Sequence, residues 1–99
     1  MAGIMRWLVI GGTTESVDAV KYLVSKRADV TVSVATDMGA ALYVDFSVKL
    51  WVGYLNQDQF TKKIQVSEIT HVLDASHPYA VEVTQIVQRV CDELGLVYI

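Results

Sequence analysis

The feature that most constrains the fold of this chain is a short apolar run that ends in two glycines and leads directly into a helical pattern. The run Arg6–Ile10 has the sequence RWLVI, which is too short for a helix and rich enough in branched side chains for a buried strand. Gly11 and Gly12 follow it. Apolar residues between 17 and 24 then recur at helical spacing, and either Thr13 or Thr14 is suited to cap that helix. This part of the chain therefore predicts a strand, a glycine turn and a helix.

Strand-like and helix-like segments continue to alternate to the end of the chain. We expect further strands at 30–35, 48–53, 70–75 and 96–99, a polar turn at 36–40, and helices that begin at Asn56 and near Pro78. Strands that alternate with helices imply right-handed crossovers, a mostly parallel sheet and helices on both faces. We therefore predict an α/β protein with a Rossmann-like, doubly wound sheet of about five strands in three α/β/α layers. Residues 1–99 are expected to form one dinucleotide-binding domain.

The later helices carry signals at their ends. Gln59 lies three residues after Asn56, which is a variant of the capping box, and Phe60 and Ile64 mark the inner face of that helix. Gly95 is placed to stop the last helix. These signals predict where two helices begin or end and which side of one of them is buried.

Three polar loops are expected to meet at one edge of such a sheet. Ligands of doubly wound sheets bind beyond the carboxyl ends of the strands, near the point where the strand order reverses. If the first strand is central, the loops at 11–16, 35–39 and 76–79 meet there. They are also the most polar and least helix-like segments of the chain, so they hold the candidate functional residues.

The first loop, GGTTES, is a candidate phosphate site. A helix N-terminus presents unpaired N–H groups and about half a positive charge, while glycines let a phosphate approach the backbone. The loop is neither a complete G-x-G-x-x-G fingerprint nor a Walker loop, and a tight turn with an ordinary Thr cap explains it equally well. Glu15 suits the helix dipole but repels a phosphate, so we expect it to point away or to touch a ribose or amide.

The tip of the second predicted strand bears on the choice of nicotinamide cofactor. An acidic residue there holds the ribose 2′-hydroxyl of NAD, but this tip has Thr36, with Asp37 one position further. Thr36 can hydrogen-bond a 2′-phosphate, which favours NADPH, although no Arg accompanies it. A plain turn or helix cap at Thr36 and Asp37 is an equally good interpretation.

The third loop brings Ser76, His77, Pro78 and Tyr79 to the end of the fourth predicted strand. Pro78 suits a first helical turn, and Ser76 or His77 can cap it. An imidazole and a phenol at this edge can also face a substrate as proton donors or hydrogen-bond partners. From the spacing alone, capping and packing are favoured over that role.

Charge and composition exclude several classes of function. Eight basic and eleven acidic residues give a net charge of -3 with no long basic run, so nucleic acid is a poor partner. The apolar N-terminal run is too short for a signal peptide or a membrane span, and a single Cys91 forms no internal disulfide, so a cytoplasmic protein is expected. His71, His77 and Cys91 lack a metal-ligand spacing, and we expect no metal site.

The chain is also unusually apolar. Hydrophobic residues make up 53% of it, and their share stays above the roughly 45–50% of ordinary globular chains when the same residue classes are compared. A sheet buried on both faces, or a face that meets another domain or subunit, accounts for this excess.

Taken together, the three loop segments resemble the precorrin-6A reductase and cobalt-precorrin-6A reductase family of cobalamin biosynthesis. The segments are GGTTES, TVSVAT and DASHPYAVEV, in this order, and the similarity extends over essentially the whole chain. The resemblance implies an NADPH-dependent reductase that transfers hydride to one double bond of a corrin-type macrocycle. It also implies a Rossmann-like N-terminal half and a second domain that closes over the ligand.

The resemblance assigns expected roles to residues of this chain. The cofactor candidates in the first loop are Gly11, Gly12, Thr13, Thr14 and Ser16, and Thr36 lies where the adenosine ribose is expected. The stretch from Ser76 to Tyr79 matches a DATHPYA-like segment of the family, with Ser in place of the usual Thr, and should line the cleft near nicotinamide and macrocycle. Ser76 is then a cofactor contact, and His77 and Tyr79 are the substrate-facing catalytic candidates.

The resemblance implies a second domain beyond residues 96–99, and we expect this chain to lack it. It is then either an excised domain that keeps cofactor affinity and loses most turnover, because hydride transfer needs both reactants in near-attack geometry, or a natural short relative with another function. The expected partners are a tetrapyrrole substrate and either the missing domain or a second copy of the chain. The alternative functions are a nucleotide-binding regulatory or interaction module without chemistry, and a structural, oligomerising domain.

Overall fold

A parallel five-stranded sheet forms the centre of the molecule, with strand order β3-β2-β1-β4-β5. The computed structural model describes residues 5–77 and 80–99. Its elements are β1 (Arg6–Ile10), α1 (Thr14–Ser25), β2 (Asp29–Val34), α2 (Asp37–Ala40), the 3₁₀ helix η1 (Ala41–Tyr43), β3 (Lys49–Val52), α3 (Gln57–Val66), β4 (His71–Asp74), α4 (Val81–Leu94) and β5 (Val97–Tyr98). The predicted α/β, Rossmann-like fold with a central first strand is therefore confirmed.

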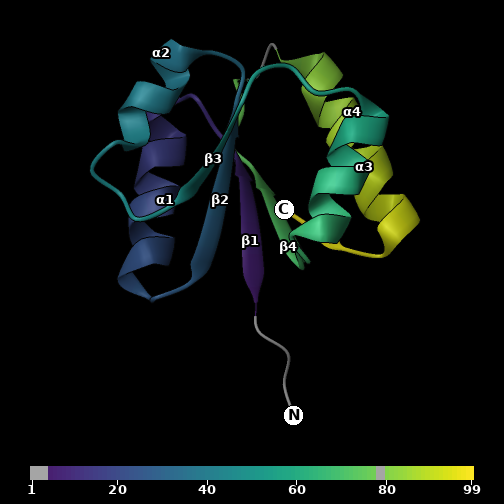
Figure 1. The fold of residues 1–99 in the computed structure, drawn as a ribbon, viewed down its shortest axis with the longest axis horizontal. Coiled ribbons are helices and arrows are strands. Elements are labelled where there is room, and N and C mark those ends of the chain that lie inside the picture. The colour runs from purple at the N-terminus through teal and green to yellow at the C-terminus, as the bar shows by residue number, and fades with distance from the viewer. Residues whose placement is uncertain (1–4, 78–79) are drawn as a thin grey trace.

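Helices cover both faces of the sheet, which lies between them as the middle of three layers (Figure 1). Helices α1 and α2 lie on one face, where Val20 and Leu23 of α1 pack against β1 and β2. Helices α3 and α4 lie on the other face, and their buried residues include Phe60 and Val87. The central strand β1 is almost wholly apolar, and β2 is buried on both sides although it alternates valine with Thr31 and Ser33, which fits a parallel sheet covered on both faces.

Local signals in the sequence fix several element ends. Thr13 is the N-cap of α1, and Asn56 forms a capping box with Gln59 at the start of α3. Gly95 ends α4 with a φ of +68°, a left-handed conformation that glycine adopts at little cost. All three were anticipated, because each depends on residues within one helical turn.

Two local predictions differ from the structure. The segment 36–40, expected to be a polar turn, contains the short helix α2, because Thr36 accepts a hydrogen bond from the amide of Gly39 and so caps it. Helix α4 begins later than expected, and its N-cap is Ala80, which makes no side-chain capping bond. Neither Ser76 nor His77 therefore caps this helix, and Pro78 lies outside the described residues.

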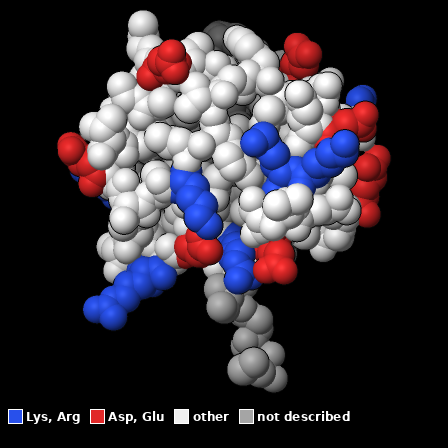
Figure 2. Space-filling view, in the orientation of Figure 1, with Lys and Arg blue, Asp and Glu red and all other residues white. Residues whose placement is uncertain are grey.

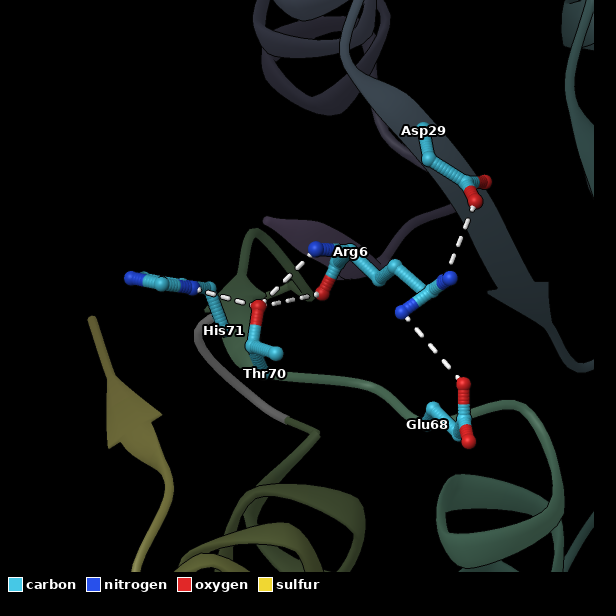
Figure 3. Close-up of polar contacts among 5 residues, drawn as sticks. All are labelled: Arg6, Asp29, Glu68, Thr70 and His71. Atoms are coloured by element: carbon cyan, nitrogen blue, oxygen red, sulfur yellow. Dashed lines mark hydrogen bonds and ion pairs between the residues drawn. The ribbon is translucent and has the colours of Figure 1, made fainter. Parts of the chain in front are cut away.

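Polar contacts join the amino ends of three strands, as Figure 3 shows. Guanidinium nitrogens of Arg6 lie 3.6 Å from a carboxylate oxygen of Asp29 and 3.4 Å from one of Glu68. The backbone N–H of Arg6 donates to the Thr70 hydroxyl at 2.9 Å. The same hydroxyl is 2.7 Å from Nδ1 of His71. Exposed ion pairs of this kind contribute about 0–1 kcal/mol to stability. We therefore assign these residues a structural role, which is to join β1, β2 and β4. The opposite edge of the sheet carries the candidate site.

None of the helices formed by residues 5–77 and 80–99 is long and apolar enough to cross a membrane.

Candidate functional site

A cleft of about 910 Å³ lies at the carboxyl ends of the strands. The loops after β1, β2 and β4 contribute to its lining, as expected, and the loop after β3 contributes as well. Its described lining residues include Gly11, Gly12, Thr13, Thr36, Met38, Gly39, Leu42, Gly53, Tyr54, Asn56, Phe60, Ser76, His77, Val83 and Ile86. The parallel sheet places these loops together because its strands all end at the same edge.

The two glycines of the first loop serve different geometric needs. A Cβ atom on Gly11 would lie 2.5 Å from the Tyr43 hydroxyl oxygen and 2.9 Å from Cγ1 of Val32, so only glycine fits there. Gly12 has a φ of +101°, and a Cβ atom there would meet nothing within 4 Å. Gly11 is therefore required by close packing behind the loop, while Gly12 keeps a strained turn and leaves open space in front of it.

The hydroxyl groups of Thr13 and Ser16 are directed into the protein. Thr13 donates to the carbonyl oxygen of Ala75 at 2.8 Å, which ties the first loop to the end of β4. The Ser16 side chain is fully buried and donates to the carbonyl oxygen of Thr13 at 2.6 Å. Ser16 therefore stabilises the loop from behind, and its hydroxyl does not reach the cleft.

Thr14 and the first amides of α1 remain at the loop surface. The Thr14 side chain is exposed, and its hydroxyl lies 3.4 Å from a carboxylate oxygen of Glu15. The amides of Gly12, Thr13 and Ser16 already have side-chain partners. Within residues 5–77 and 80–99, no partner is found for the amides of Thr14 and Glu15, which stand at the first two positions of α1.

Thr36 lies just beyond the carboxyl end of β2, the strand that pairs with β1. Its side chain is exposed, lines the cleft and caps α2 through the amide of Gly39. The two interpretations of Thr36 are thus compatible, since a hydroxyl that accepts one hydrogen bond from an amide still has its own proton to donate.

Asp74 organises the third loop. One of its carboxylate oxygens accepts hydrogen bonds from the Ser76 amide at 3.1 Å and the Ser76 hydroxyl at 2.6 Å. The other accepts from Thr84 at 2.7 Å and from the Tyr98 hydroxyl at 2.8 Å. Partial burial opposes ionisation of Asp74, but these hydrogen bonds outweigh it and lower its pKa. The carboxylate therefore joins β4, the loop, α4 and β5.

The catalytic candidates are placed only in part. His77 is exposed and lines the cleft beside Ser76. Its carbonyl oxygen accepts from the amide of Ala80 at 2.8 Å, which shapes the turn before α4. Tyr79 lies outside the described residues. The structure thus brings Ser76 and His77 to the same cleft as the glycine loop.

The described lining of the cleft contains no Lys or Arg and one acidic residue, Glu82. Figure 2 shows the same trend on one face of the molecule: basic side chains lie mostly across its middle and lower parts, and its upper centre is uncharged. An anionic ligand would therefore be held there by backbone N–H groups and hydroxyls, with no cationic Lys or Arg from the described lining.

Sequence reasoning missed three contributors to this site. Tyr43 lies in a segment without a clear pattern, and its contacts with the first loop span 31 and 27 residues. The loop after β3 adds Gly53 and Tyr54 to the cleft, although only the other three loops looked polar. Asp74 was seen only as part of the third segment, where a polar residue at the end of a buried strand was the available signal.

Comparisons with known proteins match nearly the whole chain. The family model for precorrin-6x reductase CbiJ/CobK matches residues 6–99. Cobalt-precorrin-6A reductases of Salmonella typhimurium, Synechocystis and Methanocaldococcus jannaschii are 34%, 31% and 30% identical to this chain, over 90%, 94% and 96% of its length. A solved structure of CobK precorrin-6A reductase superimposes with a TM-score of 0.85 at 26% identity, covering 96% of this chain and 38% of that one.

The match to these relatives is limited by their length. The chain spans 34%, 36% and 39% of the three curated relatives, and so about a third of each.

Proposed function

This chain belongs to the precorrin-6x reductase family, and we propose that it forms the NADPH-binding part of a reductase that transfers hydride to a corrin-type macrocycle. The observation that carries the proposal is the convergence of the glycine loop, the tip of β2 and the Ser76–His77 turn on one cleft of about 910 Å³. Pockets of about 300–1,000 Å³ are usual for ligands and cofactors, so the size suits a dinucleotide that extends along the strand ends.

The geometry of the first loop fits a pyrophosphate. Gly12 leaves open space in front of the loop, and the amides of Thr14 and Glu15 have no partner in the described part of the chain. Hydrogen bonds from N–H groups at a helix N-terminus stabilise a phosphate, and the helix dipole adds to them. We therefore assign phosphate contact to the backbone around Thr14, with the hydroxyls of Thr13 and Ser16 in supporting roles.

The other two loops hold the ends of the cofactor in this proposal. Thr36 at the tip of β2 is within the lining and donates its hydroxyl proton to the adenosine ribose or its 2′-phosphate. Ser76 and His77 border the opposite end, where the nicotinamide lies. When bound, the nicotinamide supplies the hydride, and the residues of this chain orient it and exclude water from it.

The binding site for the substrate is expected to be completed by groups outside this chain. Hydride transfer requires the macrocycle and the nicotinamide to be held at near-attack distance, which calls for a wall facing the cleft. We propose that a second domain, or another copy of the chain, supplies that wall and encloses a tetrapyrrole. His77 and Tyr79 are the residues of this chain that we propose to face the substrate.

Titration of the chain with NADPH tests the proposal, with Trp or nicotinamide fluorescence as the signal. We expect saturable binding, and NADH in a parallel titration measures the contribution of the 2′-phosphate. Absence of binding at millimolar NADPH would refute the assignment of the cleft. Turnover is then measured with a tetrapyrrole after a matching second domain is added.

A second candidate function is a nucleotide-binding regulatory module without chemistry. The observation that favours it is that the described lining has no Lys or Arg, because such a cleft binds a nucleotide through backbone N–H groups and hydroxyls. Binding of NADPH without any reductase activity, even with the second domain supplied, would favour this function over the first.

A further inference from the structure

We propose that Tyr43 is a positioning residue for the cofactor phosphates, which it serves by holding the glycine loop in its binding geometry. The inference rests on the proposed NADPH site, because Tyr43 itself acts through Gly12 and Ser16. Tyr43 ends the 3₁₀ helix η1, far from the loop in sequence, and only 1% of it is exposed. A tyrosine that is buried almost completely requires partners for its hydroxyl, and here both partners belong to the glycine loop.

The hydrogen bonds around Tyr43 have one consistent direction. The amide of Gly12 donates to the Tyr43 hydroxyl oxygen at 3.0 Å. The hydroxyl proton of Ser16 is given to the carbonyl oxygen of Thr13, so in the hydrogen bond between Ser16 and Tyr43 the phenol is the donor. The phenol thus accepts from the turn and donates to the first turn of α1, and both ends of the loop are attached to it.

This arrangement determines which amides of the loop already have a partner. The Gly12 amide is occupied by Tyr43, so it stabilises the turn with φ of +101° and is not available to a ligand. The next amides along α1, of Thr14 and Glu15, have no partner among the described residues. Tyr43 therefore separates the amide that shapes the loop from the amides that are left for phosphate oxygens.

Gly11 and Tyr43 are matched to each other. Because a Cβ atom on Gly11 would be 2.5 Å from the phenol oxygen, the tyrosine reaches the loop only where this side chain is absent. The phenol also connects two parts of the cleft. Tyr43 follows Leu42, which lines the cleft together with Met38 and Gly39 of α2, and its hydroxyl holds the glycine loop.

The substitution Tyr43→Phe removes the hydroxyl and keeps the packed ring. The Ser16 hydroxyl keeps its bonds to Thr13, and Gly12 belongs to an exposed turn, so the fold is expected to persist. We expect NADPH to bind about threefold to tenfold more weakly, which corresponds to the loss of one hydrogen bond that orders the loop. Tyr22→Phe is the control, because that tyrosine is 63% exposed on α1 and is not part of the described lining of the cleft.

Two further readouts distinguish positioning from general stability. Adenosine, which has no phosphate, is expected to bind Tyr43→Phe and the parent equally in a titration followed by NMR. In the ligand-free protein, the Gly12 amide is expected to shift and to exchange faster in Tyr43→Phe, and to stay unchanged in Tyr22→Phe. If Tyr43→Phe unfolds, Ser16→Ala removes the same phenol contact from its other end and is expected to weaken NADPH binding similarly.

The outcomes are separable from those of the proposed function. If the parent binds no NADPH, the proposed function and this inference both fail. If the parent binds NADPH and Tyr43→Phe binds it equally well, only the role of Tyr43 is overturned. Equal weakening of adenosine and NADPH, or an unchanged Gly12 amide, would also overturn it.

Discussion

Replacing Gly12 with Ala separates the two demands placed on this residue, the strained turn and the open space in front of it. Gly12 has a φ of +101°, which an L-residue adopts at a cost of about 1–2 kcal/mol. The added methyl meets nothing within 4 Å, so no steric cost is expected within the protein. A lower entropy of the unfolded chain offsets about 0.4–1 kcal/mol of this cost. The variant should therefore fold, with a free energy of unfolding lower by about 1 kcal/mol.

Binding of NADPH should be weakened at least as much as the fold is destabilised. The methyl group of Gly12→Ala occupies the space through which a phosphate would approach the loop, and a hydrogen bond to an amide requires about 2.9 Å between nitrogen and oxygen. We expect NADPH to bind at least about tenfold more weakly, a loss of about 1.4 kcal/mol in binding free energy. The dissociation constant is measured by fluorescence titration, and stability by thermal unfolding, where about 1 kcal/mol shifts Tm by roughly 4–8 °C in a domain of this size.

Gly95→Ala is the matched control for this experiment. Gly95 also has a positive φ, of +68°, and open space around its Cβ position, but it ends α4 away from the cleft. It should lose a similar amount of stability and retain full affinity for NADPH. Equal affinity in Gly12→Ala and the parent, or equal weakening in both variants, would refute the role of the open space at Gly12.

Further predictions concern the third loop and the helix behind it. Asp74→Asn should lower the free energy of unfolding by about 1–3 kcal/mol in urea titrations at neutral pH, because Asn replaces a charged acceptor of several hydrogen bonds. Since the pKa of Asp74 is lowered in the folded protein, its contribution to the free energy of unfolding is present above the ordinary pKa of 3.8 and is lost as the pH falls through the folded pKa. An identical loss of stability at acid pH in Asp74→Asn and the parent would contradict this. Burial and the Asp74 carboxylate raise the pKa of Tyr98 to about 12, and tyrosinate absorbance should show it falling in Asp74→Asn. Burial raises the pKa of Cys91 to about 11, so a thiol reagent at mildly alkaline pH should react with it only after unfolding, and rapid reaction in the native protein would disagree. His77→Ala should bind NADPH with nearly the parent affinity, whereas a large loss would move His77 from the substrate side to the cofactor.

The fold could be predicted from the sequence because its signals are local. The branched run at β1, the capping box at Asn56 and the stop at Gly95 each act within a few residues, and all three were found where expected. The parallel arrangement then followed from the alternation of strands and helices. The strand ends differ from expectation by at most one residue, which is within the usual uncertainty of such boundaries.

The site could be predicted only as far as its loops. Sequence reasoning brought three loops to one edge, but it treated the hydroxyls of Thr13 and Ser16 as groups that face a ligand. The structure directs them inward, because Ala75 and Tyr43 supply partners that are distant in sequence. Contacts over such separations depend on the tertiary fold and leave no periodic signal in the chain.

The excess of apolar residues has a partial explanation in the structure. Both faces of the sheet are buried, which uses most of the branched side chains. Some large apolar residues are nevertheless exposed beside the cleft, among them Met38, which is 84% exposed, and Tyr54, which is 87% exposed. That a ligand or a facing domain covers these exposed residues remains a prediction.

The central claim is that the glycine loop, the tip of β2 and the Ser76–His77 turn form one NADPH site. The most direct measurement is a titration of isotope-labelled chain with NADPH, followed by amide NMR shifts. We predict that the largest changes occur at Thr14, Glu15, Thr36 and Ser76, with little change at Arg6 and Thr70 on the opposite edge of the sheet. Binding that leaves the amides of Thr14 and Glu15 unchanged, or no binding at millimolar NADPH, would contradict the account.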